Sequence, residues 1–337
     1  MKKYGIGLLI FIGTFLLLGE LDFRFFSHEK KLDYDIHPTL LWRLKPQQTG
    51  FEWLANMSQK SPLIHINSLG FRGKELDLPP FEGFRILTVG SSNSLGAGVS
   101  EEAVWTAQLE QHLRQNGIPN VVYNGATPGW GPFQQAAFLE ETFESVHPNL
   151  MIVLISSGDL NFLPKTPLEQ ARFLAKEEKR KKLLSLSPFI TYSLRKTEFF
   201  ISAERKRLAS FIEPLFRSST PIATPQYPIT PHIPYWEAMI RLSETTKAPL
   251  LFVIPDLEGS LVGPALTQTL DSLTADKPMV RIVRLLPQED PLQNYLIPND
   301  GHPNEKYHAL IASTVLAHLN LAIDQQHLAH TTPFNES

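Results

Sequence analysis

The sequence predicts an α/β protein. We expect a three-layer α/β/α sandwich around a central, mainly parallel sheet, with an N-terminal transmembrane helix and a helical insertion. Three observations predict this arrangement. Between residues 84 and 323, short apolar runs alternate with segments whose apolar residues recur at helical spacing. Residues 4–19 form an unbroken apolar run. Residues 161–234 interrupt the alternation with basic and proline-rich sequence.

Size and composition set the limits of this interpretation. A chain of 337 residues with 42% hydrophobic residues can bury one large core, or one domain with an elaboration. The net charge of −3 gives no sign of a nucleic-acid partner. The absence of cysteine excludes a disulfide scaffold, a thiol nucleophile and a thiolate metal site. Nothing in the composition sets the oligomeric state.

The N-terminal apolar run predicts a membrane anchor over residues 1–26. Lys2 and Lys3 precede the run and acidic residues follow it, a charge bias that favours a cytoplasmic N-terminus and an exported body, periplasmic or extracellular. The run is shorter than the roughly 20 residues of a full span, but aromatic residues as far as Phe26 can extend it. A cleaved signal peptide and a buried core helix are the alternatives. No small-x-small cleavage site follows Leu18.

Residues 27–80 are interpreted as a linker and leading segment. They contain an aromatic stretch at residues 41–46 and a short motif, Asn-Ser-Leu-Gly-Phe-Arg-Gly, at residues 67–73.

Residues 81–330 are interpreted as the main domain. Apolar runs predict buried strands at residues 85–89, 121–123, 150–155, 250–254 and 280–285. Helical spacing predicts helices at residues 101–116, 134–145 and 304–323. Strands without a polar face indicate a parallel sheet covered on both sides. In such sheets ligands bind at the carboxyl ends of the strands.

Residues 161–234 are interpreted as an insertion in this domain. They begin with a basic helical stretch that includes residues 179–182, carry a second basic cluster at 205–207, and end in a proline-rich run. Three interpretations stay open: a solvated helical hairpin, a cap over the substrate site, or a face that lies on anionic lipid.

The first predicted strand ends in a glycine- and serine-rich turn, Gly90 to Gly96. A serine between the carboxyl end of a strand and a helix, such as Ser92, is well placed for nucleophilic attack, and its own backbone N–H can stabilise an oxyanion. Such turns also bind phosphate groups. A serine hydroxyl needs a general base to attack an ester.

Near the other end of the sequence, one loop offers such a base and its partner. Asp300 and His302 lie two residues apart just before the closing helix. An imidazole requires a partner that fixes its tautomer and stabilises its charged form, and Asp300 can supply it. A third loop, residues 124–131, follows the second predicted strand and contains Gly129, whose N–H can face a developing oxyanion.

These three segments, in this order and each at a strand end, resemble the sequence blocks of the SGNH (GDSL-like) hydrolase superfamily. The resemblance covers residues 84–323, with the insertion as a gap, and implies an SGNH/flavodoxin-like fold. It maps the nucleophile to Ser92, an oxyanion glycine to Gly129, and the acid and base to Asp300 and His302. A second histidine, His308, falls at a familiar position and is taken as structural. Residues 67–73 look like a segment that precedes the first block in membrane-associated bacterial members.

Two departures from the family pattern stand out. The aspartate of the first block is Ser91 here, which is tolerable because that aspartate is not the nucleophile. The third block ordinarily supplies an asparagine that donates to the oxyanion, and Gly158 occupies its position. The nearby amide of Asn161 is a candidate substitute. Asp300 at two residues before the histidine is a variant within the superfamily, and Asn299 occupies the other position.

The resemblance implies a serine hydrolase that cleaves a carboxylic ester, either a glycan O-acetyl group or a lipid acyl ester, without a cofactor. The ester substrate and the membrane are its expected partners. Two alternatives stay open: an O-acyltransferase of the same fold that modifies an envelope polysaccharide, or an inactive relative that binds glycan. No metal site is predicted, because the remaining histidines lack ligand spacing.

Overall fold

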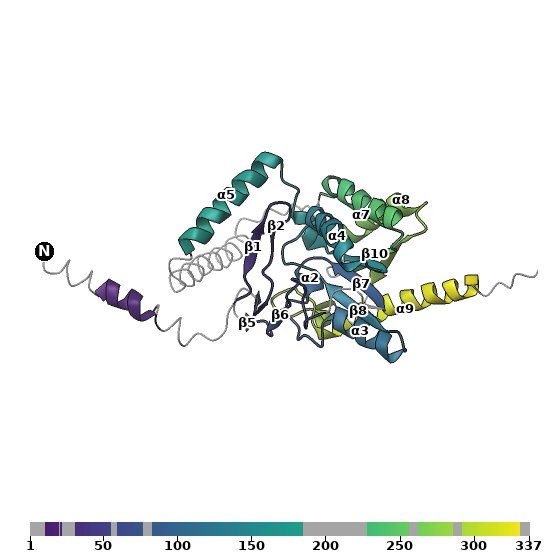
Figure 1. Ribbon diagram of the computed structural model, residues 1–337, viewed down its shortest axis with the longest axis horizontal. Coiled ribbons are helices and arrows are strands. Elements are labelled where there is room, and N and C mark those ends of the chain that lie inside the picture. The colour runs from purple at the N-terminus through teal and green to yellow at the C-terminus, as the bar shows by residue number, and fades with distance from the viewer. Residues whose placement is uncertain are drawn as a thin grey trace, which may run out of the picture. The chain divides into compact units, whose positions relative to one another are not determined.

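The protein is described by a computed structural model that covers residues 11–19, 21, 31–54, 59–76, 83–184, 228–255, 262–285 and 292–330 (Figure 1). In chain order its elements are β1 (Tyr34–His37), β2 (Leu41–Leu44), β3 (Gln48–Gly50), β4 (Trp53–Leu54), β5 (Gln59–Lys60), β6 (Ile64–Ile66), β7 (Phe84–Val89), α2 (Ser92–Leu95), α3 (Trp105–Gln115), β8 (Asn120–Asn124), α4 (Pro132–Val146), β9 (Leu150–Leu154), η1 (Ser157–Asn161), α5 (Pro167–Leu184), η2 (Thr230–His232), α7 (Ile233–Thr246), β10 (Leu250–Pro255), α8 (Val262–Thr274), β11 (Val280–Leu285), η3 (Leu292–Tyr295) and α9 (Glu305–His330).

A parallel sheet forms the centre of the larger unit. Its described strands run in the order β11-β10-β9-β7-β8, and every neighbouring pair is parallel. Successive side chains of a strand point to opposite faces. Leu87 and Val89 of β7 therefore enter one apolar cluster, and Ile86 enters the other. Because both of their faces are covered, the inner strands β9 and β10 read as continuous hydrophobic runs in the sequence, whereas the edge strand β11 carries two exposed arginines.

Helices cover both faces of this sheet, as the sequence predicts. One cluster joins the sheet to α4, α7 and α8, and the other joins it to α3 and α9 (Figure 1). The predicted central parallel sheet with flanking helices is thus confirmed. Helix α3 begins at Trp105, later than the predicted residue 101, and α7 and α8 lie where no helix was predicted.

The strand order places the first strand of the sheet between the second and the third. The chain leaves β7 toward β8 on one side and then returns to β9 on the other side. Ligands bind in parallel sheets at such a reversal, outside the carboxyl ends of the two strands concerned. The turn after β7 that carries Ser92 lies at this point.

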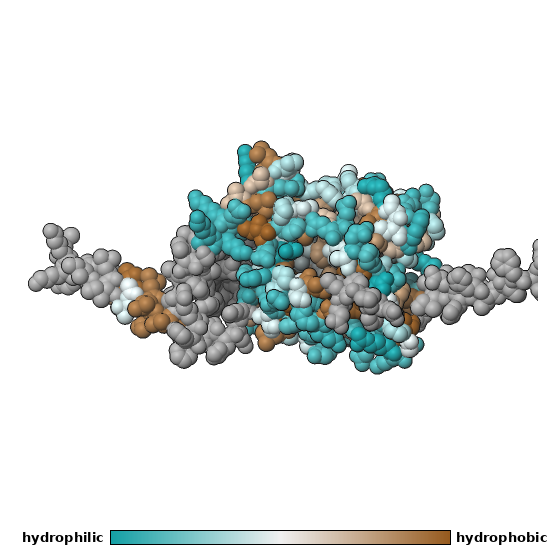
Figure 2. All heavy atoms as spheres, in the orientation of Figure 1, coloured by the Kyte–Doolittle hydropathy of each residue, from teal (hydrophilic) through white to brown (hydrophobic). Residues whose placement is uncertain are grey.

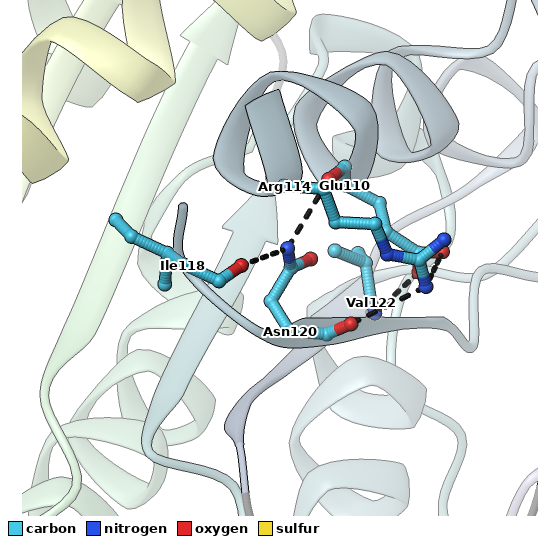
Figure 3. Close-up of polar contacts among 5 residues, drawn as sticks. All are labelled: Glu110, Arg114, Ile118, Asn120 and Val122. Atoms are coloured by element: carbon cyan, nitrogen blue, oxygen red, sulfur yellow. Dashed lines mark hydrogen bonds and ion pairs between the residues drawn. The ribbon is translucent and has the colours of Figure 1, made fainter. Parts of the chain in front are cut away.

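Strand β8 is the edge of the five-stranded sheet, and polar side chains cover its backbone (Figure 3). The carboxylate of Glu110 accepts a hydrogen bond from Val122 N–H at 2.9 Å and pairs with Arg114 at 2.6 Å. Asn120 Nδ2 donates to the carbonyls of Glu110 and Ile118. These contacts fix α3 against β8 and leave fewer edge groups free to pair with another chain.

The leading segment is more structured than a linker. It forms three antiparallel pairs, β1 with β2, β3 with β6, and β4 with β5. Its buried residues share an apolar cluster with Leu95 of α2 and Ala126 after β8. Residues 32–164 and 224–337 form one compact unit, so the segment belongs with the sheet. The predicted boundaries at residues 26, 80 and 330 stay predictions.

The predicted transmembrane helix is not supported. Residues 11–19 are helical, with exposed apolar side chains such as Phe11 and Phe15 (Figure 2). No helix in the described ranges has the length and apolar character needed to cross a membrane. Apart from Leu21, the rest of the predicted anchor over residues 1–26 lies outside the described residues.

The predicted insertion begins with helix α5, which belongs to a second compact unit. Thr166 and Glu169 cap its first turn, with Thr166 N–H and Oγ1 both donating to Glu169 Oε2 at 2.8 Å. Lys181 and Lys182 lie in its last turn, where positive charge complements the helix dipole. Residues 185–227, with the second basic cluster, lie outside the described residues.

Candidate active site

A tight turn after β7 presents Ser92 at the first position of the short helix α2. The turn requires glycine at position 90, because a Cβ there would lie 2.5 Å from Ser94 Cβ and 2.9 Å from the carbonyl oxygen of Leu154. One turn later Gly96 ends the helix with a φ of +82°, and its N–H donates to the carbonyl of Ser92 at 3.0 Å. Ser92 therefore lies on a short, closely packed elbow at the carboxyl end of a central strand.

The loop before α9 presents Asp300 and His302. Its backbone closes on itself, with Asp300 N–H donating to the carbonyl of Ile297 at 3.1 Å and Ile297 N–H donating to the carbonyl of His302 at 2.8 Å. Asn299 and Gly301 take positive φ values of 61° and 93°. Asparagine and glycine tolerate this conformation better than other residues, so the local sequence is suited to the tight loop.

The two loops meet at a pair of side chains. His302 Nε2 lies 2.9 Å from Ser92 Oγ, and His302 Nδ1 is hydrogen-bonded to Asp300 Oδ1. A carboxylate can only accept, so the proton belongs on Nδ1 and Nε2 is left as the acceptor for the serine hydroxyl. The Asp300 side chain is 7% exposed and the His302 side chain 26%. The arrangement brings the predicted nucleophile, base and orienting carboxylate within hydrogen-bond reach of one another.

The backbone at Gly98 packs against the side chain of Ile297, in the loop that carries His302. A Cβ at Gly98 would lie 1.8 Å from Ile297 Cδ1, so the chain just after α2 packs directly on the loop that carries His302. Only glycine permits this approach without moving Ile297.

The loop after β8 lies beside the nucleophile turn. Thr127 N–H donates to the carbonyl of Gly90 at 3.2 Å, and Gly125 N–H donates to the carbonyl of Thr88 at 2.9 Å. Pro128 and Gly129 occupy the centre of the next turn, which Trp130 N–H closes on Thr127 at 3.3 Å. Gly129 has a φ of +77°, as a type II turn requires.

The backbone N–H groups of the two predicted oxyanion donors, Ser92 and Gly129, make no hydrogen bond to the described part of the protein. The structure does not bring Asn161 into the same set. Asn161 is exposed at the end of η1, and no hydrogen bond joins it to Ser92 or His302. Its assignment as an oxyanion donor stays a prediction. Gly158 is also exposed, and a Cβ there would meet no atom within 4 Å.

Aromatic rings border Gly129. A Cβ at this position would lie 3.3 Å from Trp42 Cζ2 and 3.6 Å from the ring of Phe162. Phe162 is 39% exposed, and the Trp42 indole N–H donates to the carbonyl of Pro128 at 3.0 Å. The leading segment thus contributes an aromatic side chain next to the site.

Asp159 is a buried carboxylate beside the turn that carries Ser92. The resemblance to the family blocks gave it no role. It accepts hydrogen bonds from Ser91 Oγ at 2.5 Å, from Ser156 Oγ at 2.7 Å and N–H at 3.1 Å, and from Gln135 Nε2 at 3.2 Å. Burial raises the pKa of Asp159 to about 6, and these hydrogen bonds oppose that rise. Ser91, which replaces the aspartate of the first family block, is the sequence signal that could have suggested a carboxylate partner.

His308 has a structural environment, as expected. It is fully buried, and its Nδ1 accepts a hydrogen bond from Trp105 N–H, at the start of α3, at 3.3 Å. Burial lowers the pKa of His308 to about 3, with smaller contributions from Arg72 and His302. A neutral His308 therefore caps α3 from α9.

No protein-family model and no curated protein matches the chain. Similar solved structures include TesA, with 14% identity and a TM-score of 0.45 over 69% of this chain and 96% of that one. They also include the psychrotrophic esterase EstA from Pseudoalteromonas sp., with 12% identity and a TM-score of 0.44 over 71% of this chain and 98% of that one. A GDSL-like lipase from Bacteroides thetaiotaomicron VPI-5482 matches at 11% identity and a TM-score of 0.41, over 73% of this chain and 93% of that one.

Proposed function

We propose that this chain is a serine hydrolase that cleaves carboxylic esters, with Ser92 as nucleophile, His302 as general base and Asp300 as the carboxylate that orients the imidazole. One observation carries the proposal, the 2.9 Å contact between Ser92 Oγ and His302 Nε2 with Asp300 on the far side of the ring. Serine becomes nucleophilic when a base lies within hydrogen-bond reach and a third group orients that base.

The first half of the reaction forms an acyl-enzyme. Ser92 Oγ attacks the ester carbonyl carbon while His302 Nε2 takes the hydroxyl proton, and Asp300 stabilises the resulting imidazolium. The carbonyl oxygen becomes an oxyanion that the N–H groups of Ser92 and Gly129 bind. The bond to the leaving alcohol then breaks, and His302 returns its proton to that alcohol.

Water completes the cycle. His302 takes a proton from water, the oxygen of that water attacks the acyl carbon, and the bond to Ser92 Oγ breaks. The serine regains a proton from His302 and the carboxylic acid leaves. The chain's own residues supply every proton transfer in this scheme.

The half-exposed rings beside Gly129 support an ester with an apolar face. Trp42 and Phe162 lie next to Gly129, and in the proposed reaction they would contact the acyl group or the leaving group of the ester. An acyl chain packs on such rings, and so does the flat face of a sugar. We therefore propose a lipid acyl ester or a glycan O-acetyl group as substrate, in keeping with the sequence resemblance.

The location of the enzyme is a proposal from the sequence alone. The basic residues before the N-terminal apolar run favour a cytoplasmic N-terminus and a catalytic unit on the periplasmic or extracellular side.

Labelling with a fluorophosphonate probe tests the function, because the probe reacts covalently with an activated serine. We expect label on the wild type and none on Ser92→Ala. Ser94→Ala is the matched control, since Ser94 lies in the same helical turn and its buried hydroxyl has no partner among the described residues. We expect this variant to label like the wild type. An unlabelled wild type, or label that persists on folded Ser92→Ala, would contradict the proposal.

A further inference from the structure

We propose that Arg72, in the leading segment, is a positioning residue for the nucleophile. Its guanidinium holds the carboxyl end of α2 and thereby fixes Ser92 in the orientation that meets His302. The inference rests on the proposed function and adds to it a role for the motif at residues 67–73.

The guanidinium binds three backbone carbonyls at the carboxyl end of α2 and just after it. Arg72 is 4% exposed, and its Nη1 donates to the carbonyls of Leu95 and Gly96, each at 2.6 Å. Its Nη2 donates to the carbonyl of Val99 at 2.8 Å. The last carbonyls of a helix have no hydrogen-bond donor within the helix and carry partial negative charge. A buried cation there donates to these carbonyls and balances their charge.

The chemistry of arginine suits this position better than that of lysine. A guanidinium presents several N–H groups in a rigid, planar fork, whereas an ammonium is a single point from which three carbonyls cannot be reached in the same geometry. Burial lowers the pKa of Arg72 only to about 10, so the group is charged at neutral pH.

The motif around Arg72 is built to aim this side chain. Asn67 Oδ1 accepts the N–H groups of Leu69 and Phe71, both at 3.0 Å, and Gly70 turns the chain with a φ of +87°. Phe71 then packs edge-on against Tyr123 of β8, with ring centroids 5.3 Å apart. These contacts account for the asparagine, the glycine and the phenylalanine of the motif.

The backbone of Arg72 is fixed to the sheet. Its N–H donates to the carbonyl of Asn124, the last residue of β8, at 2.9 Å. Asn124 Nδ2 in turn contacts the carbonyl of Ser94 in α2 at 3.3 Å. Arg72 thus connects the end of β8, from which the Gly129 loop departs, to the carboxyl end of the nucleophile helix.

One turn of helix separates these carbonyls from the nucleophile. The N–H groups of Gly96 and Ala97 donate to the carbonyl of Ser92 at 3.0 and 3.1 Å, so a shift of the helix end passes directly to Ser92. Gly96 packs tightly against the guanidinium, since a Cβ at this position would lie 2.8 Å from Arg72 Nη1. A misplacement of about 1 Å in a reacting group can cost roughly 100-fold in rate.

The test compares Arg72→Lys with Arg85→Lys in the full-length chain. Arg85 also binds a backbone carbonyl, that of His147 at 2.7 Å, but it lies at the amino end of β7, away from Ser92. For each variant we would measure the fluorophosphonate labelling rate per folded molecule, kcat and KM for a chromogenic acetyl ester, and thermal unfolding. We expect Arg72→Lys to lower the labelling rate and kcat by about 10- to 100-fold with little change in KM. Arg85→Lys should leave both rates near those of the wild type.

A second variant keeps the inference testable if Arg72→Lys does not fold. Asn67→Ser weakens the turn that aims Arg72 without touching the guanidinium, and we expect it to lower the labelling rate in the same direction. Equal labelling rates for folded wild type, Arg72→Lys and Asn67→Ser would overturn the inference and leave the proposed function intact. An unlabelled wild type would instead overturn the proposed function.

Discussion

Asp300 contacts His302 from only two residues away. The loop reaches this geometry through positive φ values at Asn299 and Gly301, and His302 N–H adds a 3.2 Å hydrogen bond to the same Asp300 oxygen. The carboxylate therefore sets both the backbone and the ring. The neighbouring Asn299 makes the turn, and we assign the orienting role to Asp300 alone.

Replacing Asp300 by asparagine should lower kcat by roughly 10⁴, because an amide permits the wrong imidazole tautomer and cannot stabilise the imidazolium. Steady-state hydrolysis of a chromogenic ester measures the loss. Asn299→Gly is the matched control, since glycine keeps the positive φ, and it should retain kcat. Equal activity of Asp300→Asn and wild type would remove Asp300 from the mechanism.

Gly158 stands where the family motif supplies an oxyanion donor, and the structure leaves room for one. A Cβ at Gly158 would meet nothing within 4 Å, and Gly158 is not among the glycines with positive φ. Gly158→Asn should therefore fold normally and raise kcat, by as much as about 100-fold if its amide reaches the oxyanion. Gly158→Ala, which adds a Cβ without a donor, should leave kcat unchanged. If both variants behave like the wild type, position 158 does not face the oxyanion.

At the scale of elements, a single buried carboxylate joins three parts of the fold. Asp159 in η1 binds Ser91 after β7, Ser156 after β9 and Gln135 in α4. Asp159 is the acceptor in all four of its hydrogen bonds, as an ionised carboxylate must be. This network keeps the ends of β7 and β9 together at the point where the strand order reverses.

Asp159 should also give stability a recognisable pH dependence. Its pKa in the folded chain is about 6 against an ordinary 3.8, so the folded state holds the proton more tightly. This contribution to stability is present below about pH 4 and is lost as the pH rises through 6. The difference in pKa corresponds to about 3 kcal/mol. Urea unfolding from pH 4 to 7 should show that wild type, relative to Asp159→Asn, becomes more stable as the pH falls. Parallel curves for the two proteins would contradict the raised pKa.

At the scale of the whole molecule, the compact unit that carries the proposed site begins well before the first strand of its parallel sheet. Buried residues of the leading segment, including Leu32, Ile64 and Phe71, pack with residues of the nucleophile helix and of β8. The segment also supplies Arg72 and Trp42 to the site. It is therefore part of the folded unit that carries the proposed site and more than a spacer.

Two truncations test this view. A chain that starts at residue 31 keeps all buried residues that the structure describes in the leading segment, so we expect it to fold and to be labelled by the fluorophosphonate probe. A chain that starts at residue 77 exposes the apolar residues that packed on that segment, and we expect it to lose labelling and cooperative unfolding. Fluorophosphonate labelling and thermal unfolding followed by circular dichroism, measured on both proteins, test these two expectations. Full activity of the shorter chain would show that the leading segment is dispensable.

The sequence by itself determined the features that a local pattern can carry. Fully apolar strands predicted a covered parallel sheet, because a strand buried on both faces has no polar alternation. Ser92, Gly129, Asp300 and His302 were predicted as site residues because each follows or precedes an element end at a family-like spacing. The hairpins of the leading segment were not predicted, since strands of two to four residues are too short to show a period.

Only the tertiary structure decided which of these groups meet and what holds them. The contact between Ser92 and His302 depends on two loops about two hundred residues apart. The roles of Arg72 and Asp159 depend on hydrogen bonds to partners in other elements, which leave no periodic trace in the chain. A backbone carbonyl that accepts a hydrogen bond from a buried guanidinium can belong to any residue type. No sequence motif at residues 95–99 could therefore have predicted this contact. Local spacing encodes the elements, whereas the folded chain selects the partners that position the chemistry.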